Sequence, residues 1–177
     1  MKKILLFVLS FSFVVNTNAS HLMGGEITWK CIKSGSDYGK YVFTVKVYRD
    51  CQGIAINTNM SLTAHNVPGL NTIPLQYMGV VDISPSCNTI DGPNYAYSCN
   101  SSGILGVGSV EEHTYQSQPI RIIGIPDSNG WHFTWESCCR NHAITNLYNN
   151  TGQYGFTLRS VMYAYTDSLG TVYPHNN

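Results

Sequence analysis

Hydrophobic and polar residues alternate along much of this chain with the period of two that half-buried β-strands show. The clearest run covers residues 41–49, where aromatic and β-branched residues fill most odd positions and Thr44 and Lys46 are among the even ones. A second alternating run at 26–32 precedes it, and the segment between the two is rich in the Ser, Gly and Asp of turns. We therefore predict a β-hairpin over residues 22–50.

Shorter runs rich in β-branched and aromatic residues predict the remaining strands. They cover residues 60–64, 73–81, 111–117, 119–125, 131–137 and 154–165. Only residues 141–147 have the composition of a helical turn, and that segment is too short to nucleate a helix unaided. Many short strands separated by turn residues indicate an all-β fold, either an antiparallel β-sandwich or a Greek-key barrel, cross-linked by disulfides.

Residues 1–19 follow a different pattern, which is typical of a secretory signal peptide. Two lysines precede an apolar run at 4–15, and small or polar residues follow it up to Ala19. The apolar run is shorter than the ~20 residues that span a bilayer. We expect cleavage after Ala19. This leaves a single β-domain over residues 20–177, without a membrane span, that is secreted or held at the cell surface.

Charge is sparse and balanced, which argues against some classes of partner. The whole chain has ten Lys and Arg residues against ten Asp and Glu residues, and charged residues make up only 11% of it. Removing Lys2 and Lys3 with the signal peptide leaves eight basic residues against ten acidic ones, a formal charge of −2. A chain without a basic block is not expected to bind nucleic acid, since phosphate neutralisation supplies much of that affinity.

The six cysteines are expected to form disulfides if the chain is exported, because exported chains meet an oxidising environment. We expect three disulfides among Cys31, Cys51, Cys87, Cys99, Cys138 and Cys139. Cys87 and Cys99 flank a loop that contains Pro, Gly and Asn, and we predict that they pair with each other. The adjacent Cys138 and Cys139 are not expected to bond each other, because the peptide between them would be strained. How these two pair with Cys31 and Cys51 stays open.

Four segments together carry a family resemblance. They are SHLMGGEIT at 20–28, VYRDC at 47–51, VEEHTY at 110–115 and ESCCRNHAITNL at 136–147. In these segments the chain resembles the N-terminal module of large exported surface proteins of the Bacteroidetes, many of which continue into PKD-type immunoglobulin-like repeats and a gliding-motility-associated C-terminal region. The resemblance implies an extracellular β-domain for adhesion or for building a surface structure. Its partners would be a surface or glycan ligand, or neighbouring domains if the chain is the front module of a longer protein.

A structural ion pair is predicted between Asp50 and Arg140. If Cys51 bonds to Cys138 or Cys139, the guanidinium of Arg140 comes near Asp50. Two-pronged hydrogen bonds between them would then lock the strand ends. The alternative is that the same place contacts a ligand.

His21 is a candidate metal ligand. Cleavage after Ser20 would make His21 the new N-terminus. Its amine and imidazole, with His113 or His132, would then offer the nitrogen ligands that suit copper, as in secreted polysaccharide oxygenases. Cleavage after Ala19 is the better site, so we expect no metal and no other cofactor.

Two further chemistries are not favoured by the sequence. Cys139 and His142 are a close Cys–His pair, but export makes a disulfide-linked turn the better interpretation than a catalytic thiolate or a zinc site. The adjacent Glu111 and Glu112 point to opposite faces of a strand and cannot form a glycosidase pair by themselves.

Aromatic residues offer one more function, because their rings can stack on sugars. Trp29, Trp131 and Trp135 could line a carbohydrate platform, but Trp131 and Trp135 alternate with Phe133 on one strand face, which favours a core position for these two. The better ligand candidates are tyrosines near loops, namely Tyr95, Tyr97 and Tyr148. The sequence therefore predicts a non-catalytic, exported cell-surface module with a structural or adhesive role. The rival interpretations are a carbohydrate-binding module, a secreted copper oxygenase and a glycan hydrolase.

Overall fold

The computed structural model describes residues 22–51, 53–85, 98–99, 109–138, 140–141, 144–148 and 154–174. The predicted signal peptide lies outside these ranges. Several residues singled out in the sequence also lie outside them, namely His21, Cys87, Tyr95, Tyr97, Cys139 and His142.

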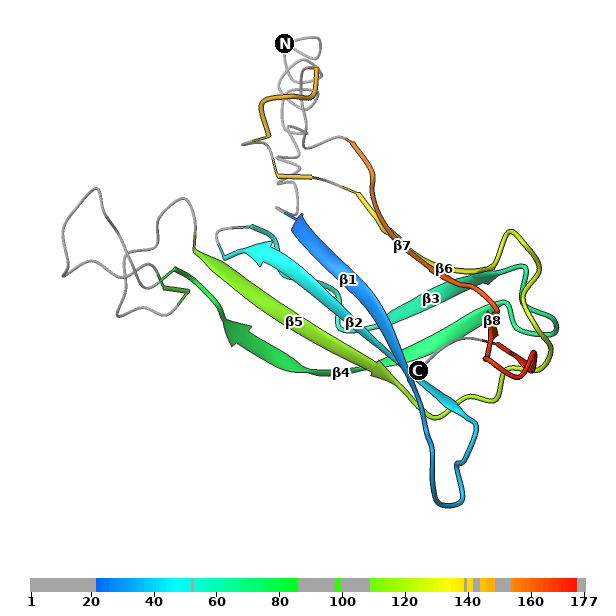
Figure 1. The fold of residues 1–177 in the computed structure, drawn as a ribbon. Coiled ribbons are helices and arrows are strands. Elements are labelled where there is room, and N and C mark those ends of the chain that lie inside the picture. Colours follow the sequence, from blue (N-terminus) through cyan, green and yellow to red (C-terminus); the bar gives the residue numbers. More distant parts are fainter. Residues whose placement is uncertain are drawn as a thin grey trace, which may run out of the picture.

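Nine strands, and no helix, form the described part of the chain (Figure 1). The strands are β1 (Leu22–Cys31), β2 (Tyr41–Asp50), β3 (Met60–His65), β4 (Thr72–Asp82), β5 (Val110–Ser117), β6 (Trp131–Ser137), β7 (Phe156–Met162), β8 (Tyr165–Thr166) and β9 (Val172–Tyr173). The predicted hairpin over 22–50 is confirmed, with β1 and β2 pairing antiparallel. So is the all-β fold.

The first seven strands form one antiparallel sheet in the order β1-β2-β5-β4-β3-β6-β7. Three consecutive strands, β3 to β5, lie side by side, while β2 returns beside β5 and β6 beside β3. A strand that returns beside such a trio is the mark of a Greek key, and the sheet contains two of them. The short strands β8 and β9 pair only with each other.

The sheet curls until its two end strands meet, so that it is nearly a closed barrel (Figure 1). Leu22 at the start of β1 forms an isolated bridge with Arg140, and its carbonyl accepts a hydrogen bond from Asn141 at 3.2 Å. Farther along β1, Gly25 faces Leu158 of β7. A Cβ on Gly25 would lie 2.7 Å from a methyl carbon of Leu158 and 2.6 Å from a backbone oxygen of β2. The absence of a side chain at Gly25 therefore lets β1 and β7 approach.

The core fills the inside of this barrel, as the alternation of residues predicts. Phe43 of β2 and Phe133 of β6 are fully buried, and their ring centroids lie 4.6 Å apart, so they join opposite parts of the sheet. Each such side chain stabilises the fold by about 1.5–3 kcal/mol through burial. Other side chains with no exposed surface are Val45, Val47, Leu62, Ile73, Tyr115 and Met162.

Two predicted elements differ from the structure. The strand predicted at 119–125 is wrong, because that segment forms only an isolated bridge between Ile120 and Tyr41. Gly124 adopts a φ of 103°, which interrupts extended backbone there. The run predicted at 154–165 is divided into β7 and β8.

Candidate functional site

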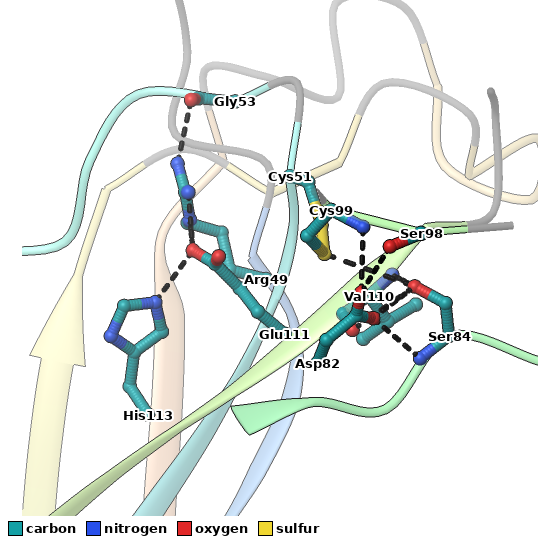
Figure 2. The surroundings of a disulfide bond; sticks show 10 residues. All are labelled: Arg49, Cys51, Gly53, Asp82, Ser84, Ser98, Cys99, Val110, Glu111 and His113. Atoms are coloured by element: carbon teal, nitrogen blue, oxygen red, sulfur yellow. Dashed lines mark hydrogen bonds and ion pairs between the residues drawn. A yellow bond between two sulfur atoms is a disulfide. The ribbon is translucent and has the colours of Figure 1, made fainter. Parts of the chain in front are cut away.

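One end of the barrel is closed by a disulfide and by a cluster of charged side chains (Figure 2). Cys51 follows the last residue of β2, and its bond to Cys99 spans 48 residues of chain, with the two Cα atoms 5.5 Å apart. Strand β5 lies between β2 and β4 in the sheet, so the ends of these three strands meet where the disulfide forms.

A chain of buried polar groups runs beside this disulfide. Arg49 is 8% exposed and pairs with the carboxylate of Glu111, while its Nη1 donates to the carbonyl of Gly53 at 2.6 Å. The same Glu111 oxygen lies 2.7 Å from Nε2 of His113, and the other ring nitrogen of His113 lies 3.1 Å from the hydroxyl of Tyr77. Burial, and then the negative charge of Glu111, raise the pKa of Tyr77. Each charged group in this row, from Arg49 through Glu111 to His113, therefore has a partner within the protein.

A second cluster fixes the chain on the other side of the disulfide. One oxygen of the Asp82 carboxylate accepts hydrogen bonds from the backbone N–H and the hydroxyl of Ser84. Its other oxygen accepts them from the Ser98 hydroxyl at 2.7 Å and from the Cys99 N–H at 2.8 Å. These bonds, led by that of the Ser84 hydroxyl, hold the pKa of Asp82 well below its usual range. Asp82 thus anchors the Cys99 end of the disulfide to β4.

The same place has the residue types of a metal centre. The sulfurs of Cys51 and Cys99 and a carboxylate oxygen of Glu111 all lie within 4.8 Å of one another. Metals bind cysteine as a thiolate, however, and here the two sulfurs are bonded to each other. The guanidinium of Arg49 already neutralises Glu111. We therefore interpret the cluster as a covalent and ionic closure of the barrel.

The predicted disulfide between Cys87 and Cys99 is wrong, because Cys99 is bonded to Cys51. Sequence spacing favours a local loop, but the sheet order places only β5 between β2 and β4, so the ends of these strands lie close and favour the distant partner. Cys138 is also in a disulfide.

The expectation that all six cysteines form disulfides is wrong as well, since Cys31 is a free thiol. Cys31 pairs with Tyr41 at the turn end of the β1–β2 hairpin, whereas Leu22 pairs with Arg49 at its other end. Cys51 lies at that other end, about 30 Å away for ten residues of strand. Strand geometry therefore keeps Cys31 apart from Cys51.

The predicted ion pair between Asp50 and Arg140 is not among the ion pairs of the described residues, and its premise, a bond from Cys51 to Cys138 or Cys139, fails. Arg140 instead donates from Nε to the carbonyl of Gly155 at 2.7 Å, and its guanidinium lies 5.9 Å from the ring centroid of Phe156. It helps to hold the start of β7.

The two histidines considered as copper ligands are already engaged. Both ring nitrogens of His113 face protein groups, namely Glu111 and Tyr77. His132 on β6 has Nε2 2.7 Å from the carbonyl of Asn129 and Nδ1 2.9 Å from the guanidinium of Arg159. Copper binding at either ring would first break these contacts.

The prediction that Glu111 and Glu112 point to opposite faces of a strand is confirmed. Glu112 pairs with Lys46 on the outer face, whereas Glu111 pairs with Arg49.

The tryptophans belong to the core or its border, as the alternation favours. Trp131 is 2% exposed, and Trp29 and Trp135 are partly buried against the core. Tyr148, by contrast, is 84% exposed and is the one loop tyrosine of the three candidates that the structure describes.

A polar groove opens where β3 and β6 part. Their pairing covers only residues 63–65 and 132–134, so the start of β3 and the end of β6 diverge. The groove has a volume of about 650 Å³. Its floor and walls include Leu22, Asn57, Ser61, Thr63, Trp135 and Glu136. The ring of Trp135 packs at 67° to that of Phe156 and is partly buried against the core, so it is only partly accessible to a ligand.

A second hollow, which we call the tyrosine pocket, lies at the opposite end of the barrel from the disulfide. Its volume is about 540 Å³, and it is lined by Cys31, Ile32, Lys33, Tyr38, Gly39, Tyr41, Ile122, Tyr165, Tyr173 and Pro174. The rings of Tyr165 and Tyr173 are stacked, with centroids 6.5 Å apart. They are 38% and 44% exposed, and Tyr38 is 66% exposed.

The sequence interpretation missed this pocket, although a local signal existed. Tyr165 and Tyr173 flank the turn from Asp167 to Gly170, in which the Asp167 carboxylate accepts backbone hydrogen bonds from Leu169 and Thr171. That turn chemistry predicts a tight hairpin and hence two tyrosines side by side. The contribution of Tyr38 could not be predicted, because it comes from the distant β1–β2 turn.

Comparisons with protein-family models, with curated proteins and with solved structures gave no match to this chain. Within the described residues, no helix has the length and apolar character needed to cross a membrane.

Proposed function

We propose that the chain is an exported, non-catalytic module of the cell surface with an adhesive role. Four features support the proposal. The N-terminal pattern is that of a signal peptide, and a disulfide closes the barrel, as expected in an oxidising compartment. The four motif segments resemble modules of exported surface proteins. The charged cluster beside the disulfide has its partners within the protein and so serves the framework.

The tyrosine pocket carries this proposal, and the ligand class that it fits is a short segment of glycan. Exposed, stacked Tyr165 and Tyr173 present ring faces against which the C–H faces of a sugar can pack. Lys33 and the tyrosine hydroxyls add donors and acceptors for sugar hydroxyls. A volume of about 540 Å³ lies within the range of small-ligand sites. Tyr165 and Tyr173 are held side by side by the pairing of β8 with β9.

The polar groove between β3 and β6 is the weaker candidate for the same role. It offers many hydrogen-bonding side chains, but its one large ring, Trp135, is packed against Phe156. Selectivity for sugars usually needs both a ring face and polar groups, and only the tyrosine pocket offers exposed rings.

A glycan array probed with the labelled exported protein tests the proposal, followed by calorimetry with the best glycan. We expect binding that Tyr165→Ala or Tyr173→Ala weakens at least about tenfold, because each removes a stacking face. Tyr148→Ala is the matched control, since Tyr148 is exposed but does not line the pocket. Absence of any bound glycan, or an equal loss with Tyr148→Ala, would refute the ligand class.

A further inference from the structure

Strand β4 is paired along only part of one side. Strand β3 pairs with it over residues 72–75, whereas β5 pairs with it from Leu75 to Asp82. Among the residues that the structure describes, no strand pairs with the β3 side of β4 beyond residue 75 (Figure 1). The second half of β4 therefore presents an open strand edge.

The backbone of this edge has groups aimed away from the barrel. The N–H of Ile83 donates to the carbonyl of Val110 in β5 at 2.9 Å. Backbone groups of successive residues in a strand point to alternate sides. The N–H and C=O groups of Val80 and Asp82 therefore point to the side of β4 that faces away from β5.

The side chains of this edge are unusually apolar for an exposed strand. Val80, Val81 and Ile83 are 50%, 60% and 44% exposed. No Lys, Arg or Pro occurs from Gln76 to Ile83, although such residues are the common protection of strand edges. A bulge between Tyr77 and Gly79 interrupts the first part of the edge, so the regular stretch is 79–83.

We propose that residues 79–83 pair antiparallel with the same residues of a second copy of this chain, about a two-fold axis at Val81. Val80 of each copy then lies opposite Asp82 of the other. These are the residues whose backbone groups point outward, so the two pairs form hydrogen bonds in both directions. The sheets of the two barrels become continuous.

The order of residues favours a second copy as the occupant. The two Val81 side chains meet on the axis, and Gly79 faces Ile83, so no like charges are opposed. The Asp82 carboxylate lies opposite Val80, and it is already satisfied by Ser84, Ser98 and Cys99 of its own chain. An interface that contacts itself in this way is the requirement of a two-fold dimer.

Cross-linking tests the register. At the axis, Val81 of each copy forms a pair without mutual hydrogen bonds, whose Cα atoms lie about 4.5 Å apart, within the range that a disulfide bridges. We expect Val81→Cys, in a Cys31→Ser background, to form a covalent dimer on oxidation, seen on a non-reducing gel. Ile123→Cys in the same background is the control, because Ile123 is 72% exposed and lies outside the edge. A monomeric Val81→Cys protein, or equal dimerisation of the control, overturns the proposal.

Sedimentation of the unaltered chain provides the second measurement. We expect a monomer–dimer equilibrium that depends on concentration. Val81→Lys should weaken it at least about tenfold, because two ammonium groups then oppose each other on the axis. A chain that stays monomeric at every concentration, or a Val81→Lys protein that associates as tightly as the original, overturns the pairing. Neither result bears on glycan binding, because the tyrosine pocket does not include this edge.

Discussion

Glu111 is the residue on which the charged cluster depends. Its carboxylate is the shared partner of Arg49 and His113, both less than a tenth exposed. A buried cation that loses its counter-charge keeps the whole cost of leaving water. Removing the charge of Glu111 should therefore destabilise the protein by more than the pair itself contributes.

We expect Glu111→Gln to lower the free energy of unfolding by about 3–5 kcal/mol, the usual result of breaking a buried ion pair. Thermal unfolding followed by circular dichroism measures it. For a domain of this size each kcal/mol corresponds to about 2–4 °C in Tm.

Glu112→Gln is the matched control for this change. Glu112 is the next residue along β5 and pairs with Lys46, whose side chain is 35% exposed. Exposed pairs contribute at most about 1 kcal/mol, so the control should change Tm little. Similar losses in the two variants would contradict the assigned role of Glu111.

The partner of Arg49 could not have been predicted from the sequence. Arg49 and Glu111 are 62 residues apart, and only the position of β5 beside β2 brings them together. The expectation at Asp50 and Arg140 depended on a bond from Cys51 to Cys138 or Cys139, and Cys51 is bonded to Cys99 instead.

At the scale of elements, the barrel depends on how closely β1 and β7 approach. Gly25 is the position where a side chain would interfere, because both a backbone oxygen of β2 and Leu158 of β7 lie in its way. The oxygen belongs to backbone, which cannot rotate aside.

We expect Gly25→Ala to destabilise the protein by about 1–3 kcal/mol, the cost of overpacking. Urea unfolding measures it through the transition midpoint. Gly24→Ala is the control, because the nearest atom to its added Cβ, a ring carbon of Tyr48, is 3.4 Å away. If Gly25→Ala is no more harmful than Gly24→Ala, the close approach of β1 and β7 is not limiting.

The position of a strand along the chain could be predicted where hydrophobic and polar residues alternate strongly. Which other strands it pairs with in the sheet could not. Residues 41–49 and 131–137 bury one face as expected. The segment 119–125 has strand-like composition, yet Gly124 with its positive φ breaks it. No local pattern distinguishes a β2 that lies beside β3 from a β2 that lies beside β5, because pairing across a Greek key is set by the packing of the whole core.

At the scale of the whole molecule, one disulfide joins the end of β2 to the chain that follows β4. In the chain-entropy view, closing a loop of this length restricts the unfolded state by about 4 kcal/mol. The disulfide also fixes the end of the barrel where Arg49 and Glu111 are buried.

We expect the double variant Cys51→Ser and Cys99→Ser to lose about 2–5 kcal/mol of stability, measured by urea unfolding without reductant. Cys31→Ser should change stability little, because Cys31 is a free, half-buried thiol. Reductant should destabilise the original chain and leave the double variant less affected. A double variant as stable as the original would show that the noncovalent contacts alone close the barrel.

The placement of the first and last described residues has a mechanical consequence. Leu22 lies at the disulfide end of the barrel, beside Arg49, whereas Pro174 lines the tyrosine pocket at the other end. A pull between these two points is directed along the strands. Ladder hydrogen bonds are perpendicular to the strands, so such a load shears many of them at once and does not unzip them one by one. A load applied at these two points therefore meets the barrel in the direction in which its strand pairing is strongest.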